Sequence, residues 1–306
     1  MKFGLIIPTL NAGGNFLKLL EQISEQTLQT EKLLIDSDST DGTDALAKKF
    51  GFEVVKVLRS DFHHGATRQL ALENLLKKNP CDVVIFLTQD IFLHDKNSLA
   101  ELVKIFSEDE SVGVSYGRQL PHENATTEAK FLRSFNYPEE NQLRSLEDKK
   151  KFGIKTAMNS DSFAAYRVSA LEKVGGFPAQ VILAEDMFVA AKILLEGYKI
   201  FYSADAKVFH SHNYTAAQEF HRYFDIGVFH SRESWIRKTF GSAEGAGKKF
   251  VLMKFAALLK KNPLECFGAF FRDLAKFSGY RLGLMEKILP KSLCKKFSMH
   301  KNFWKS

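Results

Sequence analysis

Several carboxylates of this sequence lie where a predicted strand ends or a predicted helix begins, and there they can bind a cation or transfer a proton. Asp90 ends the stretch "DVVIFLTQD", in which residues 83–87 form a continuous apolar run typical of a buried strand. An acid at such a position can supply an oxygen ligand to a hard divalent cation, and Thr88 and Gln89 offer neutral oxygens beside it. Asp also commonly ends strands and caps helices, so the segment alone leaves a structural role open.

Two adjacent acids and two alternating histidines are further candidates for chemistry. Glu185 and Asp186, in "AEDMF", stand at the expected start of a helix, where a carboxylate can act as a general base and where capping is the structural alternative. Their side chains diverge by about 100° on a helix, so they cannot share one role. His210 and His212 end "AKVFHSH", and an alternating pair favours a functional role over a purely structural one.

The secondary-structure elements that must position these residues are predicted to be strands and helices in alternation. Apolar stretches alternate with segments of helical spacing such as "FLKLLEQISEQ". This pattern predicts an α/β fold with a Rossmann-like, mostly parallel central sheet flanked by helices. Ligands of such sheets bind outside the carboxyl ends of the strands, so one rim is expected to gather the polar segments that follow them. These segments are 9–11, 36–41 and 88–90.

The last quarter of the chain differs in charge from the rest. Residues 232–306 hold 17 Lys and Arg against 5 Asp and Glu, whereas residues 1–231 hold 26 against 31. This asymmetry indicates a polyanionic partner for the C-terminal region, either nucleic acid or an anionic membrane, with a solvated basic face as the alternative. We expect residues 216–306 to form a basic, aromatic-rich helical extension of a first region that carries the motifs.

Aromatic and basic residues share a helical spacing within this extension. Between 264 and 289 apolar residues recur mostly at i, i+3 and i+4, with Arg272, Lys276 and Arg281 among them. A helix that is cationic on one side and aromatic on the other suits the headgroup layer of an anionic membrane. Packing of the aromatic stripe on the first region or in a dimer is the alternative. The sequence contains no stretch approaching the roughly 18 uninterrupted apolar residues of a spanning helix.

Cysteine usage and the first residues favour the cytoplasm. Cys81, Cys266 and Cys294 are widely spaced and form no CxxC pair, so neither a disulfide framework nor a zinc site is expected. The first residues run directly into an apolar stretch broken at Pro8, which does not match the pattern of a signal peptide. We therefore expect a cytoplasmic protein that lies peripherally on the inner face of the cell membrane.

Six motifs in order resemble those of the family 2 glycosyltransferases, inverting enzymes with the A-type nucleotide-sugar transferase fold. The motifs are "IIPTLN", "IDSDSTDGT", "HGATRQLA", "LTQD", "VGGF" and "AEDMFVAAKILLEGY", and the similarity covers about residues 3–215. The forms "DFHHGATR", "FLTQD" and "HSHNYT" are similar to a rhamnosyltransferase subset, in which TQD replaces the usual DxD. The resemblance implies that residues 1–215 form the nucleotide-sugar-binding and catalytic domain.

The resemblance also implies roles for the reactive residues. Asp90 would bind Mg²⁺ or Mn²⁺, which stabilises a departing diphosphate, and His210 or His212 would compensate for the missing first acid of DxD. Asp186 would be the general base that takes the proton of the acceptor hydroxyl, and Glu185 would orient that hydroxyl.

Nucleotide binding is assigned to the remaining loops. The residues expected to bind the nucleotide are Pro8, Thr9, Asn11, Asp36, Arg68 and Gln89. Arg68 would reach the base or the phosphates from a helix start that attracts anions, unless that helix is an ordinary capped surface helix. Asp161, in "NSDS", would lie on the acceptor side.

A departure from the family pattern bears on the donor. Ser37 follows Asp36 where the family commonly has a second acid that meets a uracil ring, which favours a donor such as dTDP-L-rhamnose over a UDP-sugar. The expected reaction transfers L-rhamnose to a hydroxyl of a cell-surface glycan or a lipid-linked oligosaccharide. The first alternative is the same fold with a UDP- or GDP-linked donor.

Two other functional classes compete with this interpretation. A nucleic-acid-binding protein would use the basic extension, but the predicted rim is acidic and the sequence has no RRM, KH or helix-turn-helix signature. A non-catalytic sugar-binding homologue is suggested by TQD in place of DxD. The presence of Asp90, Glu185 and Asp186 together argues against it.

Overall fold

The computed structural model of the protein describes residues 1–241 and 244–305. Its strands are β1 (Phe3–Thr9), β2 (Glu31–Asp36), β3 (Glu53–Lys56), β4 (Val83–Leu87), β5 (Phe92–Leu93), β6 (Val112–Leu120), β7 (Gln142–Arg144), β8 (Phe163–Arg167) and β9 (Lys199–Phe209). Its helices in the first region are α1 (Phe16–Ser24), α2 (Thr43–Lys49), α3 (His64–Lys78), α4 (Ser98–Val103), α5 (Ile105–Glu108), α6 (Thr127–Asn136), α7 (Lys149–Phe152), α8 (Val168–Val174) and α9 (Glu185–Leu195).

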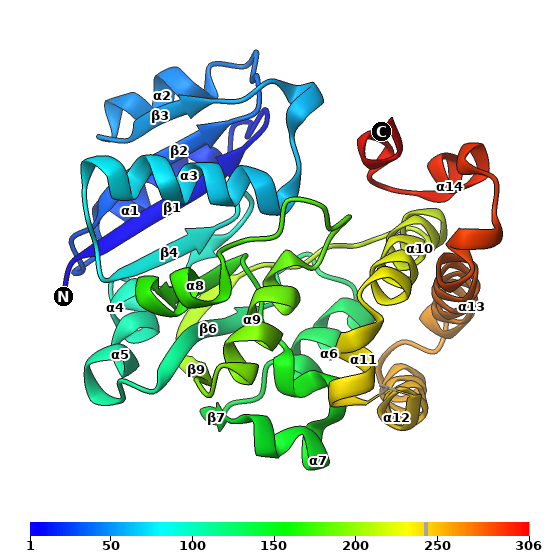
Figure 1. Ribbon diagram of the computed structural model, residues 1–306. Coiled ribbons are helices and arrows are strands. Elements are labelled where there is room, and N and C mark those ends of the chain that lie inside the picture. Colours follow the sequence, from blue (N-terminus) through cyan, green and yellow to red (C-terminus); the bar gives the residue numbers. More distant parts are fainter. Residues whose placement is uncertain (242–243, 306) are drawn as a thin grey trace.

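The C-terminal region is helical, as expected from the sequence. It contains α10 (Ala216–Arg232), α11 (Ser234–Phe240), α12 (Glu244–Lys261), α13 (Glu265–Leu284), α14 (Lys291–Phe297) and the 3-10 helix η5 (Lys301–Lys305). Further 3-10 turns are η1 (Arg59–Asp61), η2 (Leu146–Asp148), η3 (Gly153–Ala157) and η4 (Glu286–Ile288). These helices gather on one side of the α/β part, at the right of Figure 1.

Within the described residues the strands form one mixed sheet in the order β3-β2-β1-β4-β8-β6-β9-β5, with β7 paired to β9. The first four strands of this order are parallel, as the alternating pattern predicts. Strand β8 runs antiparallel to both β4 and β6, and β9 returns parallel to β6. The α/β fold is confirmed, and the carboxyl ends of β1, β2 and β4 lie at one edge of the sheet.

Helices cover both faces of the sheet, which explains why its strands are apolar throughout. Leu5 and Ile7 of β1 pack with α1, α4 and α5, whereas Ile6 packs on the other face with α3, α8 and α9. Successive side chains of a strand point to opposite faces, so a strand covered twice needs apolar residues at every position. All five residues of β4 are accordingly buried, and Asp90 follows where this burial ends.

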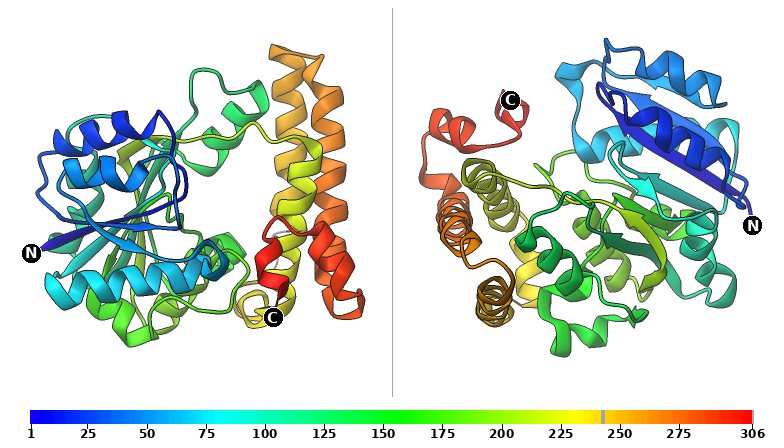
Figure 2. Two further views of the ribbon diagram at one scale, coloured as in Figure 1. Left: turned by 90° about the horizontal axis from the view of Figure 1, so that it is seen from above. Right: turned by 180° about the vertical axis from the view of Figure 1, so that it is seen from behind.

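Helices α10 and α13 pack closely through glycines. A side chain at Gly279 would collide with the carbonyl oxygen of Phe220, and one at Gly283 would collide with that of Phe224. The absence of a Cβ on these two residues therefore lets the helix backbones approach each other directly. Figure 2 shows α10, α12 and α13 running side by side as a layer next to the α/β part.

A buried ionic cluster joins this helical layer to α6. Lys254 of α12 is fully buried and pairs with Glu128 of α6 at 3.0 Å and with Asp273 of α13 at 2.5 Å. Arg272 also contacts Glu128, at 2.6 Å, and Lys276 contacts Glu219 of α10 at 3.2 Å. Two of the three cations interleaved with the aromatic stripe thus face the protein interior.

The aromatic face of α13 points away from the protein instead. The exposed apolar side chains of α12, α13 and the flanking turns include Leu252, Leu259, Leu264, Phe267, Phe270, Phe271, Leu274, Phe277 and Ile288. Phe267 is 74% exposed and Phe277 is 65% exposed. Within the part of the chain that the structure describes, these exposed side chains do not pack on the first region. Among the described residues, no helix combines the length and apolar character needed to cross a membrane.

Candidate active site

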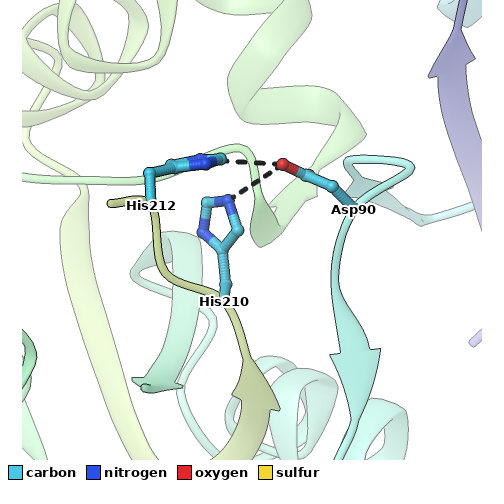
Figure 3. Close-up of side chains that lie close together, drawn as sticks. All are labelled: Asp90, His210 and His212. Carbon is cyan, nitrogen blue, oxygen red and sulfur yellow. Dashed lines mark ion pairs between the residues drawn. The ribbon is translucent and has the colours of Figure 1, made fainter. Parts of the chain in front are cut away.

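Three predicted metal ligands converge beyond the carboxyl end of β4. The carboxylate of Asp90 lies 3.4 Å from Nε2 of His210 and 3.6 Å from Nε2 of His212 (Figure 3). Both histidines come from the segment that follows β9, and the three ligand atoms lie within 4.8 Å of one another. Sequence reasoning left open which histidine would join Asp90, and the structure brings both of them to it.

The surroundings of His210 fix its orientation. Its Nδ1 lies 2.9 Å from Oε1 of Gln119, an oxygen that also accepts from the Arg133 guanidinium at 2.5 Å. The amide nitrogen of Gln119 donates to Ser160, which sets the amide's orientation. Since Oε1 can only accept, Nδ1 of His210 donates to Gln119, and Nε2 is the ring nitrogen that faces Asp90. Gln119 and Arg133 were not predicted from the sequence, where nothing marks them.

The protonation states of these groups suit a cation. Burial opposes ionisation of Asp90, but its hydrogen bond and charge interaction with His210 outweigh burial and lower its pKa. Burial and the neighbouring His210 lower the pKa of His212 to about 4. Asp90 is therefore ionised and His212 is neutral near pH 7, as metal ligands must be.

A pocket of about 550 Å³ opens beside these ligands. Of the residues predicted to bind a nucleotide or metal, Pro8, Thr9, Arg68, Gln89 and Asp90 line it. A pocket of this size suits a small-molecule ligand. Residues at the carboxyl ends of β1 and β4, which the sequence predicts to gather at one edge of the sheet, thus line a concave site.

The other predicted nucleotide residues lie in the loops that shape this pocket. Asp36 is fully buried, and its carboxylate accepts hydrogen bonds from Thr9 Oγ1 at 3.1 Å and from the backbone N–H of Ser39 at 2.9 Å. Asn11 is exposed, has a positive φ of 46°, and accepts from the backbone N–H of Thr40. Neither residue lines the pocket, so their contact with base or ribose stays a prediction.

Gln89 also acts on the loop after β1. Its side-chain oxygen accepts from the backbone N–H of Leu10 at 2.8 Å, and its amide nitrogen donates to the Leu10 carbonyl at 3.2 Å. This pair of bonds ties the end of β4 to the end of β1. Gln89 thereby holds two walls of the pocket together.

Arg68 lies between two acids rather than reaching openly into the pocket. Its Nε is 3.0 Å from Asp161 and its NH1 is 2.7 Å from Glu185, and all three side chains are buried. Gly65 permits this arrangement, because a Cβ there would collide with the carbonyl oxygen of Pro178 as α3 approaches the loop before α9. The guanidinium therefore holds Glu185 at the start of α9 and Asp161 in the segment before β8.

Asp186 is the acid of this cluster that Arg68 does not pair directly. Its carboxylate accepts from the backbone N–H of Met187 at 2.7 Å and lies 3.4 Å from the backbone nitrogen of Asp161. Burial and the charge of Glu185 raise the pKa of Asp186 to about 6. Such a value suits a general base near neutral pH. The preceding residue, Ala184, has a φ of 59°, a conformation rare outside glycine that often accompanies functional sites.

Asp161 is more enclosed than expected for an acceptor contact. It is 2% exposed, and besides Arg68 it accepts a hydrogen bond from Tyr166. Burial raises its pKa, and Asp186 and Glu185 add to the effect. Its predicted position on the acceptor side stays a prediction, while its contacts show that it helps to hold Arg68.

Comparison with known proteins identifies the family. The model of glycosyl transferase family 2 matches residues 5–175, which is more than half of the chain. The chain belongs to glycosyl transferase family 2. It is 46% identical to the O-antigen chain rhamnosyltransferase RfbN of Salmonella typhimurium, covering 99% of this chain and 96% of that protein. It is also 46% identical to the O-antigen chain rhamnosyltransferase WbaN of Salmonella anatum, covering 99% and 95%.

Solved structures support the fold of this glycosyltransferase. A mannosyltransferase from Pyrobaculum calidifontis, solved with GDP-Man and Mn²⁺, has a TM-score of 0.61 at 18% identity and covers 94% of this chain and 86% of its own. TarS 1–349 of S. aureus, solved with UDP-GlcNAc, has a TM-score of 0.57 at 18% identity and covers 98% and 84%. The expected A-type fold and family are confirmed. The nucleic-acid-binding and non-catalytic alternatives are not favoured.

Proposed function

We propose that this glycosyltransferase moves L-rhamnose from dTDP-L-rhamnose to a hydroxyl of a growing O-antigen glycan or a lipid-linked oligosaccharide. The similarity to two O-antigen chain rhamnosyltransferases over essentially the whole chain supports the sugar and the acceptor class. The observation that carries the chemistry is the meeting of Asp90, which lines the pocket, with His210 and His212. Ser37, which lines the pocket after Asp36, supports dTDP over UDP.

The side chains of Asp90, His210 and His212 fit a divalent cation. One carboxylate and two imidazoles supply three ligand atoms, and the hydrogen bond from Nδ1 to Gln119 leaves Nε2 of His210 as the ring nitrogen that would bind the metal. Nitrogen ligands suit Mn²⁺ better than Mg²⁺, so we assign Asp90, His210 and His212 to Mn²⁺. When bound there, the cation would neutralise charge that develops on the departing diphosphate.

Asp186 is assigned as the general base. As the acceptor oxygen bonds to the anomeric carbon, its proton passes to the Asp186 carboxylate, and the bond from the anomeric carbon to the phosphate oxygen breaks with its electron pair leaving on the nucleoside diphosphate. Attack opposite the leaving group inverts the anomeric configuration. Glu185 is assigned to orienting the acceptor hydroxyl, with its own charge held by Arg68 at 2.7 Å, and Asp161 to the acceptor side.

The donor is assigned to the pocket beside the metal ligands. Pro8, Thr9 and Asn11 are assigned to base and ribose together with Asp36, whose carboxylate braces the Ser39 loop. Gln89 positions the loop after β1. We assign catalysis and most of the donor pocket to residues 1–215, and membrane attachment to residues 216–306.

We further propose that the aromatic face of α13 lies on an anionic membrane at the cytoplasmic side. Helices of water-soluble proteins normally turn apolar residues inward and charges outward, whereas α13 buries Lys276 in ion pairs and exposes Phe267, Phe270 and Phe277. A patch of aromatic side chains beside a strongly basic chain segment suits the headgroup layer. A lipid-linked acceptor would be presented at the same surface.

The proposed reaction is tested with purified protein and a panel of nucleotide sugars. We expect product only with dTDP-L-rhamnose and an O-antigen fragment carrying a lipid or lipid-like aglycone, with Mn²⁺ supporting a higher rate than Mg²⁺. Chelation with EDTA should abolish turnover, and Mn²⁺ should restore it. Efficient use of UDP- or GDP-sugars in place of the rhamnose donor would contradict the proposed specificity.

A further inference from the structure

The C-terminal end of the chain forms a wall of the donor pocket. The segment 299–303, which follows α14, lines the pocket opposite residues of the loops after β1 and β3. Asn302 lies 3.5 Å from the carbonyl oxygen of Arg59, about 240 residues earlier in the chain. In Figure 1 the C-terminus accordingly lies close to the loop that joins β3 to α3.

Specific contacts hold this segment in place. Asp225 of α10 is fully buried, and its carboxylate accepts from the backbone N–H groups of Met299 at 2.9 Å and His300 at 3.1 Å. The ring of His300 packs edge-on against that of His64 at 4.8 Å. The guanidinium of Arg232 lies over Phe303 at 4.9 Å. Because the buried carboxylate of Asp225 accepts from two backbone N–H groups of this segment, the segment is part of the folded structure around the pocket.

The charges in the pocket indicate what this wall does. A nucleoside diphosphate sugar carries two negative charges, but the guanidinium of Arg68, which sequence reasoning assigned to base or phosphates, is engaged by Asp161 and Glu185. Among the described lining residues, Arg59 and Lys301 are the Lys or Arg side chains without an ion pair, and both are exposed. Cations left unpaired beside a pocket attract phosphate oxygens.

We propose that Lys301, together with Arg59, binds the diphosphate of the donor, and that residues 299–303 complete the donor pocket. This inference rests on the proposed function, because it requires a nucleoside diphosphate in this pocket. It assigns a role in the reaction to a segment outside the matched family region, which ends at residue 175.

The test compares point variants in the full-length protein. Calorimetric titration with dTDP measures nucleotide binding without an acceptor. We expect Lys301→Ala to raise the Kd for dTDP about tenfold, as for loss of one charged hydrogen bond, and Arg59→Ala combined with Lys301→Ala to raise it further. Lys301→Arg should restore most of the affinity. The matched control is Lys296→Ala, which removes an exposed lysine of α14 that does not line the pocket.

The possible outcomes separate this inference from the proposed donor. Wild-type binding of dTDP with the same Kd in Lys301→Ala would overturn the inference and leave the donor intact. Binding of UDP or GDP in preference to dTDP would overturn the donor, and the same comparison of variants is then made with that nucleotide.

A second variant tests the wall itself. A chain that ends after Ser298 should lose more affinity for dTDP than Lys301→Ala, with folding checked by its melting temperature and by retained Mn²⁺ binding. Tighter binding of dTDP by this variant would show that the segment blocks the pocket, and would overturn the proposal.

Discussion

At the residue scale, one guanidinium organises three carboxylates. Arg68 pairs with Asp161 and Glu185, and among the described residues Asp186 lies next to these two acids without an ion pair of its own. Burial and Glu185 therefore favour the protonated form of Asp186 and raise its pKa. Of the two acids at the start of α9, Asp186 is thus the more easily protonated, and it is the one assigned to accept a proton during the reaction.

Replacement of Asp186 by Asn tests this assignment. Asn keeps the size of the side chain and an oxygen for the Met187 N–H, but it cannot accept the acceptor's proton. We expect kcat to fall by roughly 10²–10⁴-fold while the Kd for dTDP changes little. A helix cap would tolerate Asn well. An Asp186→Asn variant that keeps more than about a tenth of kcat would move the base to another residue.

The pH dependence of the reaction follows from the same carboxylate. The base works only when ionised, so kcat/KM should rise with pH as Asp186 loses its proton around pH 6, with a tenfold fall for each unit well below that value. The profile is measured with saturating Mn²⁺. In Asp186→Asn this ascending limb should disappear from whatever activity remains, and its persistence would assign the titration to another group.

Asp90 is expected to control the metal. Asp90→Ala leaves two imidazoles without the carboxylate, so Mn²⁺ binding and the stimulation of turnover by Mn²⁺ should both be lost. Electron paramagnetic resonance of added Mn²⁺ measures binding directly. Glu110→Ala removes an exposed acid elsewhere and should behave as wild type. Unchanged Mn²⁺ binding in Asp90→Ala would place the metal site elsewhere.

Part of this site could be predicted, because residues at the carboxyl ends of parallel strands meet at one edge of the sheet. Thr9 ends β1 and Asp90 follows the parallel strand β4, so their position at one edge follows from the alternating pattern alone. The contacts of Arg68 with Asp161 and Glu185 depend on how α3 meets two segments about a hundred residues away, which no local pattern encodes. Gln119 likewise becomes significant only when β6 is placed beside β9, which brings it to His210.

At the scale of elements, periodicity predicts the existence of α13 but not which of its faces is buried. The amphipathic pattern fits either orientation, and the choice is made by acids on other helices, Glu128 of α6 and Glu219 of α10, which draw the cations inward. The antiparallel entry of β8 between β4 and β6 was equally inaccessible, because its apolar run does not reveal its direction.

The exposed face of α13 gives a prediction about membranes. Phe270→Ser combined with Phe277→Ser should reduce sedimentation with anionic liposomes severalfold, because each substitution removes apolar surface that would enter the headgroup layer. Leu195→Ser, at an exposed leucine of α9, is the matched control and should leave binding unchanged. Equal liposome binding by the double variant and wild type would favour another partner for this face.

At the scale of the whole molecule, the excess of positive charge lies in the region that carries the exposed aromatic face. Residues 232–306 hold 12 more basic than acidic residues. Each cation near an anionic membrane contributes about 1 kcal/mol at moderate salt. Liposome binding should therefore weaken as salt is raised and be much weaker to neutral liposomes. Binding that is insensitive to both salt and lipid charge would contradict an electrostatic contribution.

The glycine contact between α10 and α13 has a consequence for which sugars the enzyme can reach. Helix α10 begins shortly after His212 and carries Asp225, while its backbone is pressed against the helix proposed to lie on the bilayer. Because the backbones of α10 and α13 are in direct contact, the pocket would lie at a fixed distance from the lipid surface. The protein would then work as a molecular ruler, selecting an acceptor hydroxyl by its distance from the membrane as well as by its chemistry.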